Sequence, residues 1–179
     1  MLKGDLHSDA VRVLTGWTAT SPDADEARRR TLDLLDDGPV AMTRAHRPGH
    51  VTASTMIAGA DGRLLLCLHG RLNMWMQVGG HCEDGDDTLA AAALREATEE
   101  SGIPGLTLDP DPIDLHIHAT PCGHHFDVRF LAKAPAGVTE QVSEESHALG
   151  WFRPDALPDP LADGVVEQVK AALVRLGQM

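Results

Sequence analysis

Three glutamates cluster in one short segment, and their spacing suits the binding of a cation. Glu99 and Glu100 follow Glu96 by three and four residues in a run rich in alanine and leucine, which favours a helix. Residues so spaced fall on one flank of a helix, where the three carboxylates converge and repel one another. Mg2+ or Mn2+ prefers oxygen ligands and would offset that repulsion. The alternative is a solvated acidic face, with Arg95 and Glu99 as an ordinary ion pair.

The loop in front of this segment can bring its backbone close to a ligand. Residues 79–87 contain three glycines among acidic residues, and Gly80 would let a substrate approach the main chain. We predict a helix that has Thr88 or Asp87 as its N-cap and ends before Gly102, a residue type suited to the left-handed conformation that closes helices.

Loop and helix together resemble the Nudix box, usually written G-x5-E-x7-R-E-U-x-E-E-x-G-U. The corresponding residues are Gly80-x6-Asp87-x7-Arg95-Glu96-Ala97-x-Glu99-Glu100-x-Gly102-Ile103. The gap after Gly80 is one residue longer than usual, and aspartate replaces the usual glutamate, so either Asp86 or Asp87 fills the first acidic position. The stretches HVTAS at residues 50–54 and GGHCE at residues 79–83 are similar to an actinobacterial subgroup of this family.

The resemblance implies roles for the box residues. It implies that Glu96, Glu99 and Glu100 hold Mg2+ or Mn2+ as the cofactor, and that Arg95 orients Glu99. A general base in this family comes from the box or from a later loop. The catalytic candidates are therefore Arg95, Glu99 and Glu100 in the box and, in the later loop, Glu140, Glu144 and Glu145. The alternative for the loop residues is plain surface charge.

The resemblance also implies an activity. We expect a metal-dependent hydrolase that cleaves a diphosphate (P–O–P) bond in a nucleoside diphosphate linked to another moiety, by attack of metal-activated water. One alternative is an isomerase of the prenyl-diphosphate type, which has a reactive cysteine just before the box helix, where this chain has Gly79. Another is a nucleotide-sensing domain without catalysis, which usually loses the box glutamates that this chain keeps.

Several further side chains could contact a substrate. Arg71 and Trp75 precede the glycine loop as a phosphate clamp and a stacking ring, although a tryptophan there is more often part of a core. His81 could donate to a phosphate or carry a proton. Arg129 could bind a phosphate, or else form an ion pair with Asp127 on its own strand or with a residue of a neighbouring strand.

A group of histidines surrounds a predicted turn. His116 and His118 share one face of a strand, and the turn brings further residues near them, so a zinc site is conceivable. Its members would be His116, His118, Cys122, His124 and His125. The spacing fits no structural zinc pattern, and the alternative is a polar turn in which His118 and His124 form a cross-strand pair.

These residues need a scaffold, which the hydrophobic pattern outlines. Helical spacing predicts a helical hairpin over residues 5–37, and a C-terminal helix over 165–176. Strand patterns occur at residues 51–58, 63–69, 75–78, 114–119, 125–132 and 149–152. This order predicts a mixed sheet with helices on both faces, in agreement with the α/β/α sandwich that the resemblance implies.

The length favours one domain. We divide residues 1–179 into an N-terminal helical extension (1–45), a Nudix core (50–160) and a C-terminal helix (161–179). The hairpin is expected to be structural, packing on the core or on a second copy in a homodimer.

Charge and composition restrict the partners. A net charge of −12 argues against a nucleic-acid or anionic-membrane surface and favours a small nucleotide-type substrate. Three cysteines without framework spacing, no signal peptide and no long apolar run predict a cytoplasmic protein.

Overall fold

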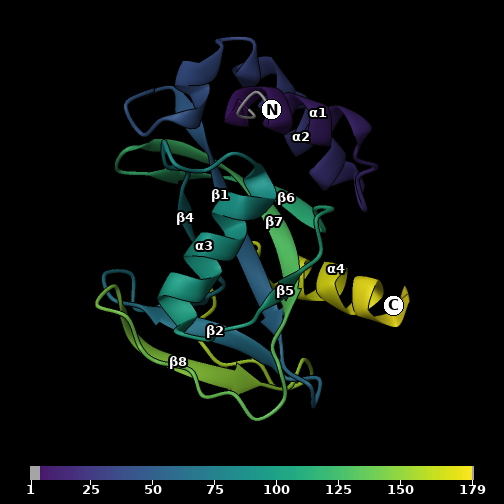
Figure 1. Ribbon diagram of the computed structural model, residues 1–179, viewed down its shortest axis with the longest axis vertical. Helices are drawn as coiled ribbons and strands as arrows, with labels where there is room; N and C mark the ends of the chain where they lie inside the picture. Colours follow the sequence, from purple (N-terminus) through teal and green to yellow (C-terminus); the bar gives the residue numbers. More distant parts are fainter. Residues whose placement is uncertain (1–4, 179) are drawn as a thin grey trace.

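The computed structural model describes residues 5–178, which form one mixed sheet with helices on both faces (Figure 1). The helices are α1 (Leu6–Gly16), α2 (Pro22–Leu35), α3 (Leu89–Ser101) and α4 (Val165–Gln178), with a short 3-10 helix, η1 (Pro39–Met42). The strands are β1 (Gly49–Ala58), β2 (Leu64–His69), β3 (Trp75–Met76), β4 (Val78–His81), β5 (Thr107–Leu108), β6 (Asp114–Thr120), β7 (Gly123–Lys133) and β8 (Ser146–Phe152).

Two long strands, β1 and β7, run parallel along the middle of the sheet and pair over their full common length, from Gly49 with His124 to Ala58 with Lys133. The middle of β1, from Thr52 to Thr55, also pairs with β4, and its last residues pair with β2. Likewise β7 pairs first with β6 and then with β5. The central strands therefore connect two parts of the sheet: β4 and β6 flank their earlier residues, and β2 and β5 flank their last residues.

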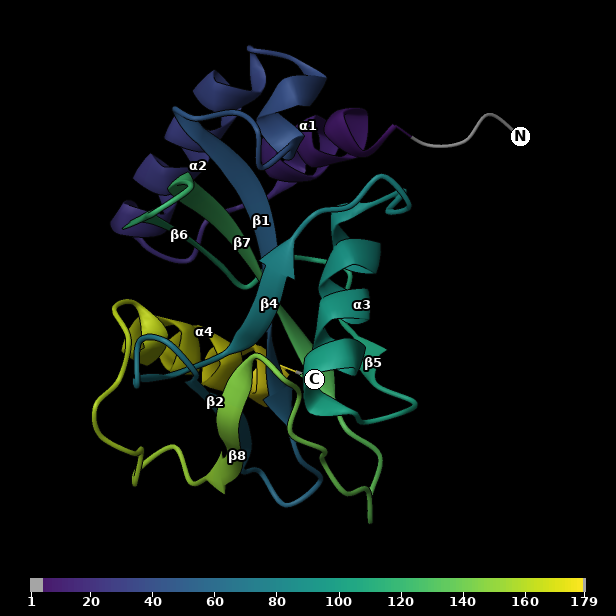
Figure 2. The same cartoon turned by 90° about the vertical axis from the view of Figure 1, so that its left-hand side faces the viewer.

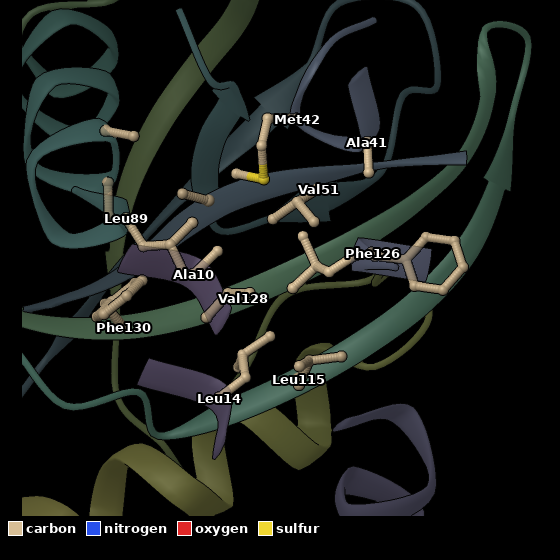
Figure 3. Packing of buried hydrophobic residues seen from close by; sticks show 14 of the residues in the cluster. Ala10, Leu14, Ala41, Met42, Val51, Leu89, Leu115, Phe126, Val128 and Phe130 are labelled. Carbon is tan, nitrogen blue, oxygen red and sulfur yellow. The ribbon is translucent and has the colours of Figure 1, made fainter. Parts of the chain in front are cut away.

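One face of the sheet is apolar along the earlier residues of β1 and β7. Val51, Ala53, Val128 and Phe130 lie in one buried cluster with Leu89 of α3. Figure 3 shows Val51 and Val128 close to Ala10 of α1. Helices α1 and α2 contribute Ala10, Leu14, Ala27 and Leu35 to this cluster, so the N-terminal hairpin is part of the main core. This placement agrees with the structural role expected for the hairpin.

The opposite face of the same strands is polar. Strand alternation places His50, Thr52 and Ser54 of β1 beside Asp127 and Arg129 of β7, and all five residues are buried. Toward the other end, α4 covers this face with the apolar residues Val165, Val169 and Ala172. Figure 2 shows α3 and α4 on opposite sides of the long strands.

The sequence signals for the helices are confirmed. Ser21 accepts a hydrogen bond from the Ala24 amide at 3.1 Å, and Pro22 occupies the first turn of α2. Strand β4 includes the first glycines of the expected loop, and the short elements η1 and β5 were not anticipated. Within the described residues, no helix is long and apolar enough to cross a membrane.

Candidate active site

Helix α3 presents the box glutamates to strand β4. The Thr88 hydroxyl accepts a hydrogen bond from the Ala91 amide at 3.0 Å, and Gly102 closes the helix with a left-handed φ of 64°. At the start of the helix, the Asp9 carboxylate of α1 accepts a hydrogen bond from the Leu89 amide at 2.9 Å. Nothing in the sequence pattern pointed to this contact, which joins the N-terminal hairpin to the box helix.

Arg95 is the centre of the charged network. Its guanidinium donates to both carboxylate oxygens of Asp86 at 3.0 and 2.9 Å, to Glu96 at 2.9 Å and to Glu99 at 3.2 Å. It also donates to the backbone carbonyl of His81 at 3.0 Å, which fixes α3 against β4. Burial opposes ionisation of Asp86, but the hydrogen bonds from Arg95 hold the pKa of Asp86 below its usual value. Asp86 thus forms the bidentate partner of Arg95.

The three glutamates differ in their environments. The side chain of Glu96 is 14% exposed and that of Glu99 is 60% exposed. Burial raises the pKa of Glu96, and it raises the pKa of Glu100 to about 7, although the Gly79 amide donates a hydrogen bond to the Glu100 carboxylate at 2.8 Å. The charges of neighbouring glutamates add to the shift of Glu100. The negative charge of the three box glutamates is therefore only partly offset by Arg95.

Gly80 leaves room for one of these carboxylates. A Cβ atom at Gly80 would lie 2.7 Å from the Glu96 carboxyl carbon, closer than nonbonded carbon atoms approach. The absence of a side chain therefore lets β4 pass directly beside Glu96. This gives Gly80 a steric role in the site.

The later acidic loop approaches the cluster. The charge of Glu145 contributes to the raised pKa values of both Glu96 and Glu100, and its backbone carbonyl accepts a hydrogen bond from the Gly70 amide at 3.1 Å. Glu144 is exposed. Glu140 accepts a hydrogen bond from the Trp151 indole at 2.9 Å. Among the three loop candidates, Glu145 is therefore the one whose charge acts on both Glu96 and Glu100.

The residues predicted to contact substrate are dispersed. Arg71 is exposed in the turn after β2, where its amide donates to the His69 ring at 3.2 Å. Trp75 packs edge to face on Phe152, with ring centroids 4.9 Å apart, as part of a core cluster. This packing favours the core interpretation of Trp75 over a stacking platform.

Arg129 lies on the sheet face opposite α3. Its side chain is 1% exposed and forms ion pairs with Asp114 and Asp127, each at 3.1 Å. It also donates to the Gly164 carbonyl at 2.7 Å. This favours the ion-pair alternative over phosphate binding, because the guanidinium already has buried partners on two strands and a loop.

The turn between β6 and β7 differs from the expected one. Thr120 pairs with Gly123, so only Pro121 and Cys122 lie between the strands, and His118 faces His125. The expected cross-strand pair of His118 with His124 is therefore wrong by one residue. The rings of His116 and His118 stack on each other at 5.5 Å, and His124 is exposed.

The box cluster can do metal-assisted chemistry. Its donors are carboxylate oxygens, the ligand type that Mg2+ and Mn2+ prefer. Burial, and then the repulsion of neighbouring glutamates, raises the pKa of Glu100 and so disfavours its ionisation. Glu96, Glu99 and Glu100 supply oxygen donors of this type, and Arg95 holds two of the carboxylates in place.

Comparison with known proteins agrees with this geometry. Residues 48–172 match the family model described as NUDIX domain. Similar solved structures include an Ap4A hydrolase from C. elegans, with a TM-score of 0.64 and 22% identity over 72% of this chain and 98% of that chain. A MutT NUDIX hydrolase from Burkholderia pseudomallei has a TM-score of 0.57 and 28% identity over 69% and 97%. An ADP-ribose pyrophosphatase from Streptococcus suis has a TM-score of 0.55 and 23% identity over 70% and 90%. No curated protein matches the chain.

Proposed function

The chain belongs to the Nudix family, and we propose that it is a divalent-metal-dependent hydrolase of a nucleoside diphosphate linked to another moiety. As a Nudix-type hydrolase it acts on pyrophosphate bonds. The observation that carries the proposal is the placement of the three box glutamates beside the glycines of β4, where Arg95 pairs with Glu96 and Glu99 and the Gly79 amide donates to Glu100. Similar structures bear the names of an Ap4A hydrolase and an ADP-ribose pyrophosphatase, which supports a nucleotide-type substrate.

Mg2+ or Mn2+ bound at the glutamates would neutralise the diphosphate oxygens and lower the pKa of the attacking water. The protein supplies the arrangement around it. Hydrogen bonds from Arg95 fix the side chains of Glu96 and Glu99, while the Gly79 amide orients Glu100. We propose that Asp86 fills the first acidic position of the box, because it is the bidentate partner of Arg95.

We propose Glu145 as the general base. It would take a proton from water as the new oxygen–phosphorus bond forms, while the bridging P–O bond breaks and the leaving phosphate departs with the bridging oxygen. The charge of Glu145 is close enough to raise the pKa values of Glu96 and Glu100. The adjacent Glu144 is exposed, as Glu145 is, but does not contribute to those pKa values, so it serves as the matched control.

Hydrolysis of a panel of substrates in the presence of Mg2+ or Mn2+ tests the proposal. The panel includes ADP-ribose, Ap4A, nucleoside triphosphates and isopentenyl diphosphate, each assayed in 18O-labelled water. We expect label in a phosphate-containing product. An intact diphosphate that has been isomerised, or label found elsewhere, would contradict hydrolysis at phosphorus.

Variants assign the residues. Glu99→Gln and Glu100→Gln should lower turnover at least about 100-fold while the protein stays folded. Glu145→Gln should lower turnover strongly, whereas Glu144→Gln should leave it near the parent value. Equal effects of the two loop variants would remove the support for Glu145 as the base.

A further inference from the structure

Four side chains on the sheet face away from α3 form a compact group of metal-ligating atoms. His50 of β1, His81 of β4, Cys122 of the β6–β7 turn and His125 of β7 place one such atom each within 4.8 Å of all the others. We propose that these residues, called the His3Cys group below, bind a structural zinc ion. The proposal does not depend on the function proposed for the box glutamates.

The distances from the Cys122 sulfur to the three histidines are close to those of a tetrahedral zinc site. The Cys122 sulfur lies 3.7 Å from Nε2 of His50, 3.7 Å from Nε2 of His81 and 3.3 Å from Nε2 of His125. With Zn–S near 2.3 Å and Zn–N near 2.0–2.1 Å, tetrahedral angles put the sulfur and each nitrogen about 3.6 Å apart. Small side-chain shifts would therefore complete the coordination.

The histidines are prepared to act as ligands. Nδ1 of His50 lies 3.3 Å from the His46 carbonyl, and donation there leaves the lone pair on Nε2, which faces Cys122. Burial and the neighbouring histidines lower the pKa values of His81 and His125 to about 4, so both rings are neutral at pH 7. Neutral imidazole is the form that binds a metal.

Zinc explains the group better than hydrogen bonding does. A thiol has one hydrogen to donate and cannot serve three imidazole nitrogens at once, whereas zinc accepts a lone pair from all four residues. Four protein ligands close the coordination sphere, which indicates a structural ion. Cys122 would bind as the thiolate and release its proton to solvent, which reaches it through a surface cavity of about 430 Å3 lined by Arg44, Ala45, Arg47, Pro121 and Cys122.

Such an ion would connect segments that are distant in the sequence. The cavity lies beside the β6–β7 turn, and the ligands belong to three strands and that turn. Sequence spacing could not identify this set, because only Cys122 and His125 lie near each other in the chain. His116, His118 and His124, which the spacing had grouped with them, are not members of the His3Cys group.

Metal analysis of the purified full-length protein tests the proposal. We expect about one zinc ion per chain, retained in Glu99→Gln, which alters only the proposed magnesium or manganese site. Cys122→Ser and His125→Ala should lose the zinc. The matched controls Cys67→Ser and His124→Ala should retain it, because Cys67 and His124 lie outside the group.

Cobalt substitution keeps the test decisive if a ligand variant fails to fold. Co2+ bound by the unaltered chain should show thiolate-to-cobalt charge-transfer absorption together with the visible absorption of a tetrahedral site. Added zinc should remove both signals, and added Mg2+ should not. Absence of zinc and of the charge-transfer absorption in the full-length protein would overturn the proposal, as would zinc that persists in folded Cys122→Ser and His125→Ala.

Discussion

Replacing Glu100 by glutamine should stabilise the protein in the absence of Mg2+ and Mn2+ while abolishing turnover. Burial is the main reason that the pKa of Glu100 is raised from 4.5 to about 7. A carboxyl whose pKa is higher in the folded state contributes stability that is fully present below the unfolded pKa and is lost as the pH rises through the folded pKa. The relevant window is therefore from about pH 4.5 to about pH 7.

The size of the effect follows from the two pKa values. Ionising Glu100 in the folded protein at pH 8 costs about 3 kcal/mol more than ionising it in the unfolded chain, and most of that cost arises above pH 5. Glutamine has no charge to desolvate, and its carbonyl oxygen can still accept the hydrogen bond from the Gly79 amide. Glu100→Gln should therefore exceed the parent in free energy of unfolding by about 2–3 kcal/mol at pH 8, and by less than about 1 kcal/mol at pH 5.

Urea denaturation of protein dialysed free of Mg2+ and Mn2+ measures this difference at both pH values. Glu99→Gln is the matched control, because the Glu99 side chain is 60% exposed and its ion pair with Arg95 contributes at most about 1 kcal/mol. Added Mg2+ should stabilise the parent at pH 8 more than it stabilises Glu100→Gln. Equal free energies of unfolding for the parent and Glu100→Gln at pH 8 would refute the idea that desolvation of the Glu100 carboxylate destabilises the folded protein.

Three further substitutions test how the site is held. Asp9→Ala should cost about 1 kcal/mol of stability by removing the acceptor for the first amide of α3, with turnover retained once the protein is folded; urea denaturation and a turnover assay check this. Gly80→Ala should lower turnover about 10- to 100-fold, because the added methyl displaces Glu96, and a parent-like kcat would contradict it. Arg129→Ala should cost about 3–5 kcal/mol, since it removes the only positive charge that pairs with the buried carboxylates of Asp114 and Asp127 among the described residues; a small loss of stability with a raised KM would instead support phosphate binding.

Local chemistry made the box helix and most strands predictable. Alanine-rich composition, the Thr88 cap and the terminal Gly102 define α3, and the structure places all three where they were expected. The α/β/α sandwich with a mixed sheet also follows from the order of helical and strand patterns. Element boundaries and short elements such as β5 carry too little periodic signal to be located.

Contacts between residues of different elements were harder to predict from the sequence. The identity of the acidic partner of Arg95 depends on the path of a glycine-rich loop, and one extra residue there left Asp86 and Asp87 indistinguishable in the sequence. Only Pro121 and Cys122 lie between β6 and β7, so His118 pairs with His125 and not with His124 as predicted. Both differences arise from loop geometry that periodicity does not encode.

Strand alternation places β4 between the two proposed metal sites. Gly80 and His81 are consecutive in β4, so the first faces the glutamates of α3 and the second faces the His3Cys group across the sheet. The two sides offer different donors, carboxylate oxygens on one and imidazole nitrogens with a thiol on the other. Mg2+ and Mn2+ prefer the first set and Zn2+ prefers the second. Because donor chemistry differs across the sheet, the two proposed sites would each select their own ion even though both lie beside β4.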